Sequence, residues 1–291
     1  MPRVLIAGCG YVGEATADLF FERDWGVEGW TCSPESAQKL CGKAYPVRAV
    51  DISDKVQVAD SKSEFDAVVH CASTRGGDAD LYRLVYLNGA RNLLDRFVGS
   101  TIVFTSSTSV YGQSDGAWVT EETATEPARG TGRVLLEAEM LVLCRGGIVA
   151  RLAGIYGPGR SALLAKILAG KAIVHPVNDR FINQVHRDVV AAALFLLSNR
   201  ASASAVEQQI YNVVDDQPIL QSECYHWLAK KLNRAPPAIG RSTSKRKRSS
   251  SNKRVSNAKL RSLGWAPEYR NFAEAMEKSI LPSFRQMARD Y

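Results

Sequence analysis

The sequence lacks the features that mark membrane-spanning and disulfide-stapled proteins. Its longest apolar stretches, such as residues 189–197, fall short of the roughly 18 residues that a membrane-spanning helix needs. A strand pattern begins after Met1-Pro2-Arg3, which leaves no room for a signal peptide. The six cysteines show no C-x-x-C or similar paired spacing, which argues against a disulfide framework and against a zinc site. We therefore expect a soluble cytoplasmic protein that holds no metal.

Most of the chain also lacks net charge. The formal charge of +7 comes from residues 241–254, RSTSKRKRSSSNKR, which hold seven basic and no acidic residues; the remainder balances 30 basic against 30 acidic side chains. A nucleic-acid surface needs a basic face spread over a domain and aromatic side chains for base stacking, and this segment offers neither. The segment is open to three interpretations: a solvated loop, a gate that attracts a phosphorylated ligand, or a nucleic-acid or localisation signal.

The chain does contain a regular alternation of short apolar strands and helical patterns. Strands are readable at residues 4–8, 27–32, 45–50, 67–71, 102–105 and 147–152. This alternation predicts an α/β fold, a doubly wound parallel sheet of the Rossmann kind with helices on both faces. The rhythm breaks at Gly157-Pro158-Gly159, which predicts a smaller, discontinuous C-terminal lobe.

A glycine-rich turn follows the first predicted strand and opens a helix. Gly8-Cys9-Gly10-Tyr11-Val12-Gly13 matches G-x-G-x-x-G, in which the first glycine allows a tight turn, the second admits a diphosphate and the third permits close helix packing. This context predicts a dinucleotide site at Gly8, Gly10, Tyr11, Val12 and Gly13. We expect residues 1–151 plus 183–214 to form the dinucleotide-binding domain and residues 152–182 plus 215–291 to form a substrate lobe that includes the basic loop 241–254.

The residues after the second strand bear on the choice between NAD and NADP. NAD-binding proteins place an acid about 20 residues beyond the turn, whereas this chain has Trp30-Thr31-Cys32-Ser33. The missing carboxylate favours NADP, because nothing there repels a 2′-phosphate. No arginine stands there to bind that phosphate either, so NAD and NADP both stay open, with Thr31 and Ser33 as expected contacts.

Further motifs resemble the extended short-chain dehydrogenase/reductases, the group that includes nucleotide-sugar epimerases and dehydratases. AVDISD is similar to the third-strand motif whose aspartate contacts adenine, which implies that role for Asp51 and a neighbouring contact for Ile52. VVHCAS is similar to the fourth-strand motif along the dinucleotide. YLNGARNLL places Asn88 where relatives keep a structural asparagine. The fourth-strand resemblance implies cofactor contacts at Cys71, Ala72 and Ser73.

The stretch TSSTSVYG, residues 105–112, carries six hydroxyl side chains behind an apolar strand. The resemblance makes Ser107 the residue that hydrogen-bonds the substrate oxygen being oxidised or reduced. It also implies a Tyr-x-x-x-Lys pair on a later helix, where the phenol moves the proton. In ARGTGRVLLEAEML the aligned positions are Thr131 and Leu135, and a shift of two residues places Arg129 and Arg133 there instead, so neither register supplies a tyrosine.

Other residues were weighed as partners of the substrate or as substitutes for the missing acid. Tyr111 and Tyr156 are the candidate replacement phenols, although neither lies on the expected helix. Arg160 suits an anionic group, because a guanidinium binds phosphate or carboxylate through two bonds. His186 is either a structural residue of its loop or a substrate contact. The expected substrate contacts are thus Ser107, Tyr111, Arg160 and His186.

Together these features predict an NAD(P)-binding oxidoreductase, epimerase or dehydratase that acts on a small anionic hydroxyl or carbonyl compound such as a nucleotide-sugar. The alternative is a catalytically silent NAD(P)-dependent sensor or ligand-binding protein, which explains Thr131 and Leu135 directly. Homodimers joined through helices near residues 88–97 and 131–143 are common in such families, and we expect one here by analogy.

Overall fold

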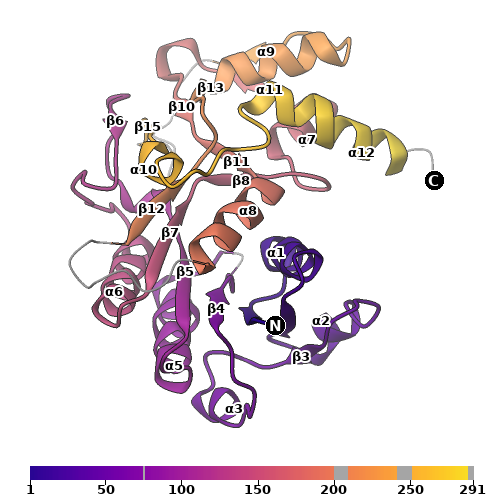
Figure 1. Cartoon of the computed structure of the whole chain (residues 1–291). Coiled ribbons are helices and arrows are strands. Elements are labelled where there is room, and N and C mark those ends of the chain that lie inside the picture. Colours follow the sequence, from indigo (N-terminus) through magenta and orange to yellow (C-terminus); the bar gives the residue numbers. More distant parts are fainter. Residues whose placement is uncertain (75, 200–208, 241–250, 288–291) are drawn as a thin grey trace. The chain divides into compact units, whose positions relative to one another are not determined.

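The computed structural model describes residues 1–74, 76–199, 209–240 and 251–287 (Figure 1). Its largest sheet has seven strands, which are β1 (Arg3–Ala7), β2 (Gly26–Thr31), β3 (Val47–Ala49), β4 (Ala67–His70), β5 (Thr101–Ser107), β7 (Ile148–Leu152) and β12 (Ile210–Val213). Their order in the sheet is β12-β7-β5-β4-β1-β2-β3. The strands run parallel, so that Ala7 lies between Trp30 and His70. The predicted doubly wound parallel sheet is confirmed.

Helices cover both faces of this sheet (Figure 1). Phe20 of one helix contacts Phe195 of a second, with ring centroids 4.9 Å apart. On the other face Trp30 contacts Phe97, at 5.9 Å between centroids. The helices associated with the sheet are α1 (Tyr11–Glu22), α2 (Pro34–Gln38), α3 (Lys55–Ala59), α4 (Ala79–Tyr82), η1 (Arg83–Asn88), α5 (Gly89–Arg96), η2 (Thr108–Val110), α6 (Gly130–Cys144) and α8 (Arg187–Ser198). Because both faces are covered, β1 can be apolar without alternation, and Val4 to Ala7 are fully buried.

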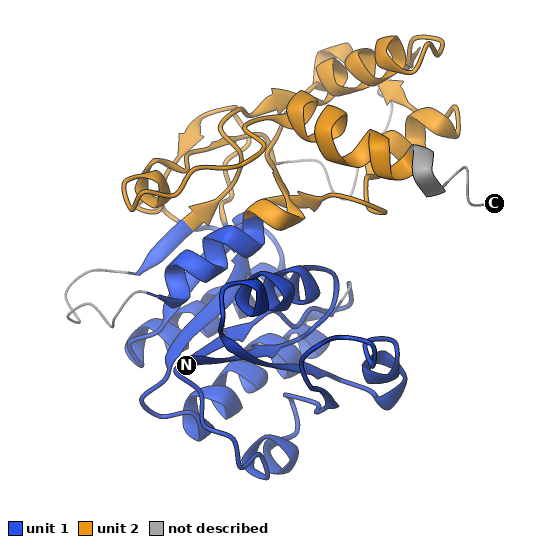
Figure 2. Ribbon diagram, turned by 45° about the vertical axis from the view of Figure 1, so that its right-hand side comes forward, with its two compact units in different colours: residues 1–110, 125–152, 190–211 blue, residues 111–124, 153–189, 212–291 orange. Residues whose placement is uncertain are grey.

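The chain divides into two compact units (Figure 2). The first comprises residues 1–110, 125–152 and 190–211, and the second comprises residues 111–124, 153–189 and 212–291. The second unit is built on a core that includes Tyr156, Leu228 and Phe272. Its elements are β6 (Trp118–Val119), β8 (Gly154–Tyr156), α7 (Ala162–Leu168), β9 (Ile173–Val174), η3 (Pro176–Asn178), β10 (Phe181–Ile182), β11 (Gln184–His186), β13 (Ile219–Leu220), α9 (Gln221–Lys231), β14 (Ala238–Ile239), β15 (Arg254–Val255), α10 (Ala258–Arg261), α11 (Phe272–Ala275), η4 (Met276–Ile280) and α12 (Leu281–Met287).

The boundaries of these units differ from those expected from the sequence. Residues 111–124 belong to the second unit, where Trp118 of β6 lies beside Arg254 of β15. Residues 183–189 also belong there, because His186 of β11 lies beside Tyr156 of β8. Both pairings join segments far apart in the sequence, which local patterns do not reveal.

No helix in the described part of the chain has the length and apolar character needed to cross a bilayer. Most of the basic segment, residues 241–250, lies outside the described residues. Its last four residues, 251–254, are described, and they pack into the second unit rather than extending as a loop.

Candidate functional site

The turn after β1 requires glycine at its first position. Gly8 has a φ of +100°, which glycine adopts freely, and a Cβ there would lie 2.2 Å from the backbone nitrogen of Ala72. The backbone N–H groups of Gly8 and Cys9 donate to the carbonyl of Trp30 at 3.0 and 2.7 Å. The turn is therefore pinned to β2 and lies directly against the segment that follows β4.

The other two glycines of the turn have contrasting surroundings. A Cβ on Gly13 would lie 2.2 Å from the carbonyl oxygen of Gly8, so α1 packs closely against the turn. A Cβ on Gly10 would meet no atom within 4 Å. Gly10 is the N-cap of α1, and no side chain caps the helix there. The amino end of α1, with its N–H groups and positive dipole end, thus fits the diphosphate of a dinucleotide.

Thr31 and Ser33 use their hydroxyls locally at the end of β2. Thr31 donates to the carbonyl of Ser33 at 3.2 Å, and Ser33 accepts from the backbone N–H of Ser36 and caps α2. Sequence reasoning found no arginine here, but the sheet register brings Arg48 of β3 beside Trp30. The Arg48 guanidinium lies 3.7 Å from the buried carboxylate of Glu28. The turn after β2 itself carries no negative charge.

The loop after β3 is held in place from two sides. The Asp51 carboxylate accepts from the backbone N–H and the hydroxyl of Ser53, at 2.9 and 2.8 Å. Asn92 of α5 donates to the carbonyls of Ile52 and Ser53 at 2.9 and 3.2 Å. These bonds fix the backbone around Asp51 and Ile52, whose adenine contacts stay a prediction.

Cys71, Ala72 and Ser73 follow β4 at the same carboxyl edge as the glycine turn. Cys71 donates its backbone N–H to the carbonyl of Ala7 at 2.7 Å, which continues the pairing with β1. Burial raises the pKa of the Cys71 thiol, and burial together with Glu14 raises the pKa of Cys9 to about 12. Both thiols are therefore neutral, and neither is activated as a nucleophile.

The hydroxyl cluster at the end of β5 separates into structural and accessible members. Thr105 is buried and donates to the carbonyl of His70 at 2.8 Å. Ser106 is buried and donates to Glu139 at 2.5 Å. Ser107 is half-buried and accepts from the backbone N–H of Ser109 at 3.1 Å, so its own proton is available to another acceptor. Ser107 is thus the member of the cluster suited to a substrate.

A buried ion pair supports this strand from α6. Arg151 of β7 donates to both carboxylate oxygens of Glu139, the shortest bond measuring 2.7 Å, and both side chains are almost completely buried. Since Ser106 lies beside Arg151 in the sheet register, all three polar side chains meet at one point under the end of β5.

The start of α6 carries the departure from the family pattern. Leu135 is 3% exposed and packs in the core, whereas Thr131 is half-buried in the first turn. Arg129 lies at the N-cap and Arg133 is exposed. Glu137, on the same helix, pairs with Arg83 of η1 through a 2.6 Å bond. In this part of α6 we find no tyrosine or lysine in either register.

The two tyrosines weighed as replacements are poorly placed for substrate contact. Tyr111 is 1% exposed, and its hydroxyl donates to Asn212 at 2.9 Å. Tyr156 is 2% exposed within the core of the second unit, where burial raises the pKa of its phenol. The substrate contact expected for Tyr111 is not supported, because the ring and its hydroxyl are enclosed.

His186 and Arg160 differ in how far their side chains are exposed. His186 is 1% exposed, its Nε2 lies 3.0 Å from the hydroxyl of Ser279, and its Nδ1 accepts from the backbone N–H of Asp188. Burial lowers the pKa of this imidazole, with Asp188 opposing the shift. These contacts favour the structural interpretation of His186. Arg160 is exposed after the turn that it forms with Gly157, and its proposed grip on an anion stays a prediction.

Sequence reasoning did not single out Lys253, which belongs to the basic segment whose three interpretations stayed open. Lys253 is 5% exposed and donates to the carbonyl of Tyr111 at 3.1 Å and to Ser251 at 2.7 Å. Burial, together with nearby Arg180, lowers its pKa to about 8. Among the described residues no carboxylate forms an ion pair with it. No local pattern signals this burial, since the lysine lies within a run of polar and basic residues.

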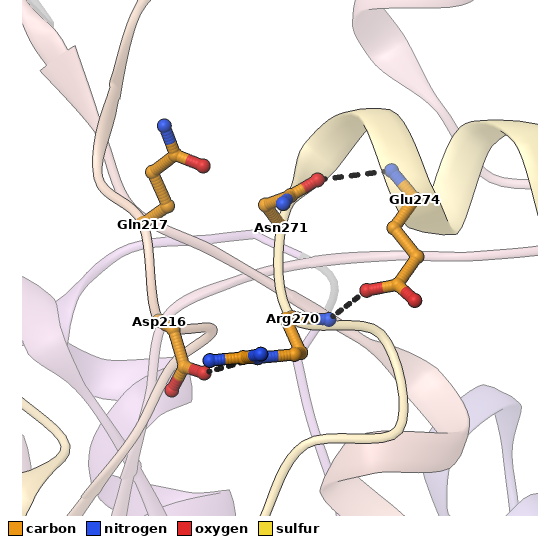
Figure 3. Close-up of a pocket in the computed structure, with 5 residues that line it drawn as sticks. All are labelled: Asp216, Gln217, Arg270, Asn271 and Glu274. Carbon is orange, nitrogen blue, oxygen red and sulfur yellow. Dashed lines mark hydrogen bonds and ion pairs between the residues drawn. The ribbon is translucent and has the colours of Figure 1, made fainter.

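A separate pocket of about 450 Å³ lies in the second unit (Figure 3). Its charged groups bind one another: Asp216 accepts from Arg270 at 3.3 Å, and Glu274 accepts from the backbone N–H of Arg270 at 2.8 Å. Asn271 caps α11. Most charged groups of the pocket are therefore engaged with one another, and only the Gln217 side chain is drawn without a partner (Figure 3). Within the described residues no group of three or more His, Cys, Asp or Glu side chains is arranged to hold a metal.

The fold and this sheet edge define a class of protein. These are the α/β proteins that bind a dinucleotide at the carboxyl ends of β1 and β4, where the order of the strands reverses. The model of the NAD dependent epimerase/dehydratase family matches residues 4–213, and the chain belongs to this family. The predicted resemblance is thereby confirmed, together with an NAD(P)-type cofactor.

Individual proteins are also similar to this chain. Protein YeeZ of Escherichia coli K12 is 30% identical over 252 residues, which cover 81% of this chain and 86% of YeeZ. A Methylobacillus flagellatus structure, provisionally described as an NAD-dependent epimerase/dehydratase, is 27% identical, with a TM-score of 0.78 over 98% of this chain and 99% of that one. The UDP-glucose 4-epimerase of Thermotoga maritima, solved with UDP-glucose, has a TM-score of 0.82 over 99% of this chain and 100% of that one. At 16% identity this last similarity is one of fold.

Proposed function

We propose that this chain is an NAD(P)-dependent epimerase, dehydratase or reductase acting on an anionic hydroxyl or carbonyl compound of the nucleotide-sugar kind. The observation that carries the proposal is the position of Ser107. Its half-buried hydroxyl ends β5 on the same sheet edge as the glycine turn. Carboxyl edges of parallel strands are where such sheets bind ligands.

Each residue of this edge has a distinct task in the proposal. A bound nicotinamide dinucleotide supplies hydride transfer. The amino end of α1 holds the diphosphate beside Gly10, and Asp51 binds the adenine. Ser107 donates its hydrogen bond to the substrate oxygen and orients it, because its own oxygen already accepts from Ser109.

Two features of this chain and one structural neighbour support an anionic substrate. Lys253 is a buried cation close to Arg180, and no described carboxylate neutralises it. Two positive charges that lie close together without a neighbouring carboxylate favour the binding of an anion. Arg160 offers a second, exposed guanidinium in the same unit. The Thermotoga maritima epimerase, which shares the fold, was solved with UDP-glucose.

A sensor without turnover is the second candidate, and a specific observation favours it. Leu135 is buried where the resemblance expects lysine, and Thr131 stands where it expects tyrosine. An aliphatic hydroxyl has no acidity near neutral pH, whereas a phenol has a pKa near 10 that its surroundings can lower. A sensor needs the dinucleotide site and no proton-transfer residue.

Turnover separates the two candidates. The purified protein is incubated with NAD⁺ or NADP⁺ and a panel of UDP- and dTDP-hexoses, and products are read by NMR. An enzyme converts at least one member. Ser107→Ala should lower that rate about 100-fold or more, while Ser109→Ala, a change on an exposed neighbour, should leave it unaltered. Equal rates in the two variants would remove Ser107 from the mechanism.

We propose that the protein prefers NADP to NAD, because no acidic residue stands in the turn after β2. This preference is tested by comparing the dissociation constants of NAD⁺ and NADP⁺ under one set of conditions. Tighter binding of NADP⁺ supports the preference, and tighter binding of NAD⁺ overturns it.

We also propose the homodimer expected from the sequence, joined through the helices near residues 88–97 and 131–143, which are α5 and α6. Met140 of α6 is a large apolar side chain that is exposed. Light scattering should report twice the chain mass, falling to the monomer in Met140→Asp; a monomeric wild type would contradict the proposal.

A further inference from the structure

The proposed function leaves one task without a residue, the transfer of the proton. The phenols weighed from the sequence, Tyr111 and Tyr156, are enclosed in the second unit. A third phenol, Tyr86, lies on a different element from the expected pair. It belongs to the first unit, on η1, and is half-buried.

The ring of Tyr86 lies against the carboxyl end of β4 and the middle of β5. It stacks on the imidazole of His70, the last residue of β4, with centroids 6.2 Å apart and planes 6° from parallel. Its edge meets Phe104, the register partner of His70 on β5, at 6.3 Å. Ring contacts with both strands fix the direction of the side chain along the sheet.

The hydroxyl of Tyr86 extends beyond the strand end. Hydrogen bonds from the Ser73 side chain and the Thr74 backbone, in the segment that follows β4, act on its pKa. That segment also supplies Ala72, whose backbone lies against Gly8. The phenol of Tyr86 is therefore on the same edge as the glycine turn and the end of β5.

The backbone of η1 favours such a placement. Residues 83–88 form a π-helix, whose wider turn redirects side chains and is frequent at functional sites. The segment is anchored to α6 by the bidentate pair of Arg83 with Glu137, at 2.6 and 3.2 Å. Tyr86 is thus held beside the helix on which the usual phenol is missing.

We infer that Tyr86 is the proton donor and acceptor of this protein, an assignment that rests on the proposed function. In the reductive direction a hydride from the reduced dinucleotide adds to the carbonyl carbon of the substrate. The carbonyl oxygen takes the proton of the Tyr86 hydroxyl, giving an alcohol, the oxidised dinucleotide and a tyrosinate. In the oxidative direction the tyrosinate takes the alcohol proton as the hydride leaves. Solvent restores the phenol or removes its proton between turnovers.

The surroundings of Tyr86 suit the donor role before the dinucleotide binds. The titratable groups that face it are Tyr82, at 4.9 Å between centroids, and His70. Burial lowers the pKa of His70 to about 4, so that imidazole is neutral at pH 7. Burial raises the pKa of Tyr86, with the bonds from Ser73 and the Thr74 backbone opposing the shift. The side chain is therefore a neutral phenol, and no charged group among the described residues is recorded as acting on it.

The test measures whether Tyr86 senses the charge of the bound nicotinamide, and it needs no substrate. Protein labelled at tyrosine Cζ with ¹³C is titrated by NMR without ligand, with saturating NAD⁺, and with saturating NADH. Tyr86→Phe identifies the Tyr86 signal, and Tyr82→Phe is the matched control one helical turn away. A positive charge within about 4–6 Å lowers a phenol pKa by about 1–3 units. The expected result is such a decrease for Tyr86 with NAD⁺ and a smaller change with NADH.

Each outcome has a defined meaning. If both dinucleotides bind and Tyr86 titrates identically in all three states, the assignment is overturned while the proposed function stands. If neither dinucleotide binds, the proposed function is overturned and the assignment with it. Where the panel yields a substrate, Tyr86→Phe should lower kcat about 10²- to 10⁴-fold with unchanged dinucleotide affinity, and Tyr82→Phe should retain the rate. Full activity in Tyr86→Phe would also overturn the assignment.

Discussion

The glycine turn and the start of α6 belong to the same unit, yet they depart from the family pattern to different degrees. In the turn, Gly8 and Gly13 occupy positions where a Cβ would lie 2.2 Å from the backbone, so sequence and packing agree residue by residue. At the start of α6, Leu135 packs as core where the resemblance implies a lysine. The residues for dinucleotide binding and those for proton transfer can therefore vary independently, because they lie on different elements of the first unit.

The largest expected effect comes from breaking the support of α6. Glu139→Gln removes the charge partner of Arg151 in a site where both side chains are almost fully buried. Leaving a buried guanidinium unpaired should cost about 3–5 kcal/mol in the free energy of unfolding, measured by urea denaturation. Glu137→Gln, on the exposed side of the same helix, is the control and should cost less than about 1 kcal/mol. Similar losses in both variants would contradict the importance given to the buried pair.

A pH-dependent effect of nearly the same size is expected from Lys253, which links residues 251–254 to the loop that follows β5. Its pKa falls from 10.5 to about 8 on folding, so between these values the unfolded chain binds more protons than the folded one. Stability should therefore rise from pH 8 to pH 10.5, by up to about 3 kcal/mol from this group. In Lys253→Met that part of the rise should disappear when unfolding is measured across the same range. An unchanged pH profile would show that the amine is solvated.

The first two glycines of the turn give a smaller effect on stability. Gly8→Ala should destabilise the fold by at least about 1–3 kcal/mol, because φ is +100° and the new methyl group meets the backbone of Ala72. Gly10→Ala has open space around the methyl group and should change stability by less than about 1 kcal/mol. Thermal unfolding of the two variants checks the contrast, and equal losses would contradict the assigned geometry.

Much of the first unit could be predicted because its signals are local. The run from Val4 to Ala7 and the glycines behind it define a strand, a turn and a helix within about 20 residues. Thr131 and Leu135 were located by the same kind of short motif. The sequence also singled out Ser107, and the structure shows that it differs from Ser106 by a single step along β5, which turns one hydroxyl inward and the next outward.

The remainder depended on contacts between distant segments. Lys253 is buried because its amine meets the carbonyl of Tyr111, which lies 142 residues earlier. Tyr86 reaches the site through a stack on His70, a contact set by the packing of η1 on β4 rather than by any motif. Local patterns carry no information on such pairs. The sequence around a basic run or an isolated tyrosine is the same whether the residue lies on the surface or in a site.

The most direct test of the central claim is a calorimetric titration of the purified chain with NAD⁺ and NADP⁺, repeated with Gly10→Val. The claim is that the open amino end of α1 binds the diphosphate of the dinucleotide. It predicts saturable binding of one dinucleotide per chain to the wild type, and a loss of affinity of at least about tenfold in the folded Gly10→Val variant. Absence of binding to the wild type, or equal affinity in the variant, would contradict it.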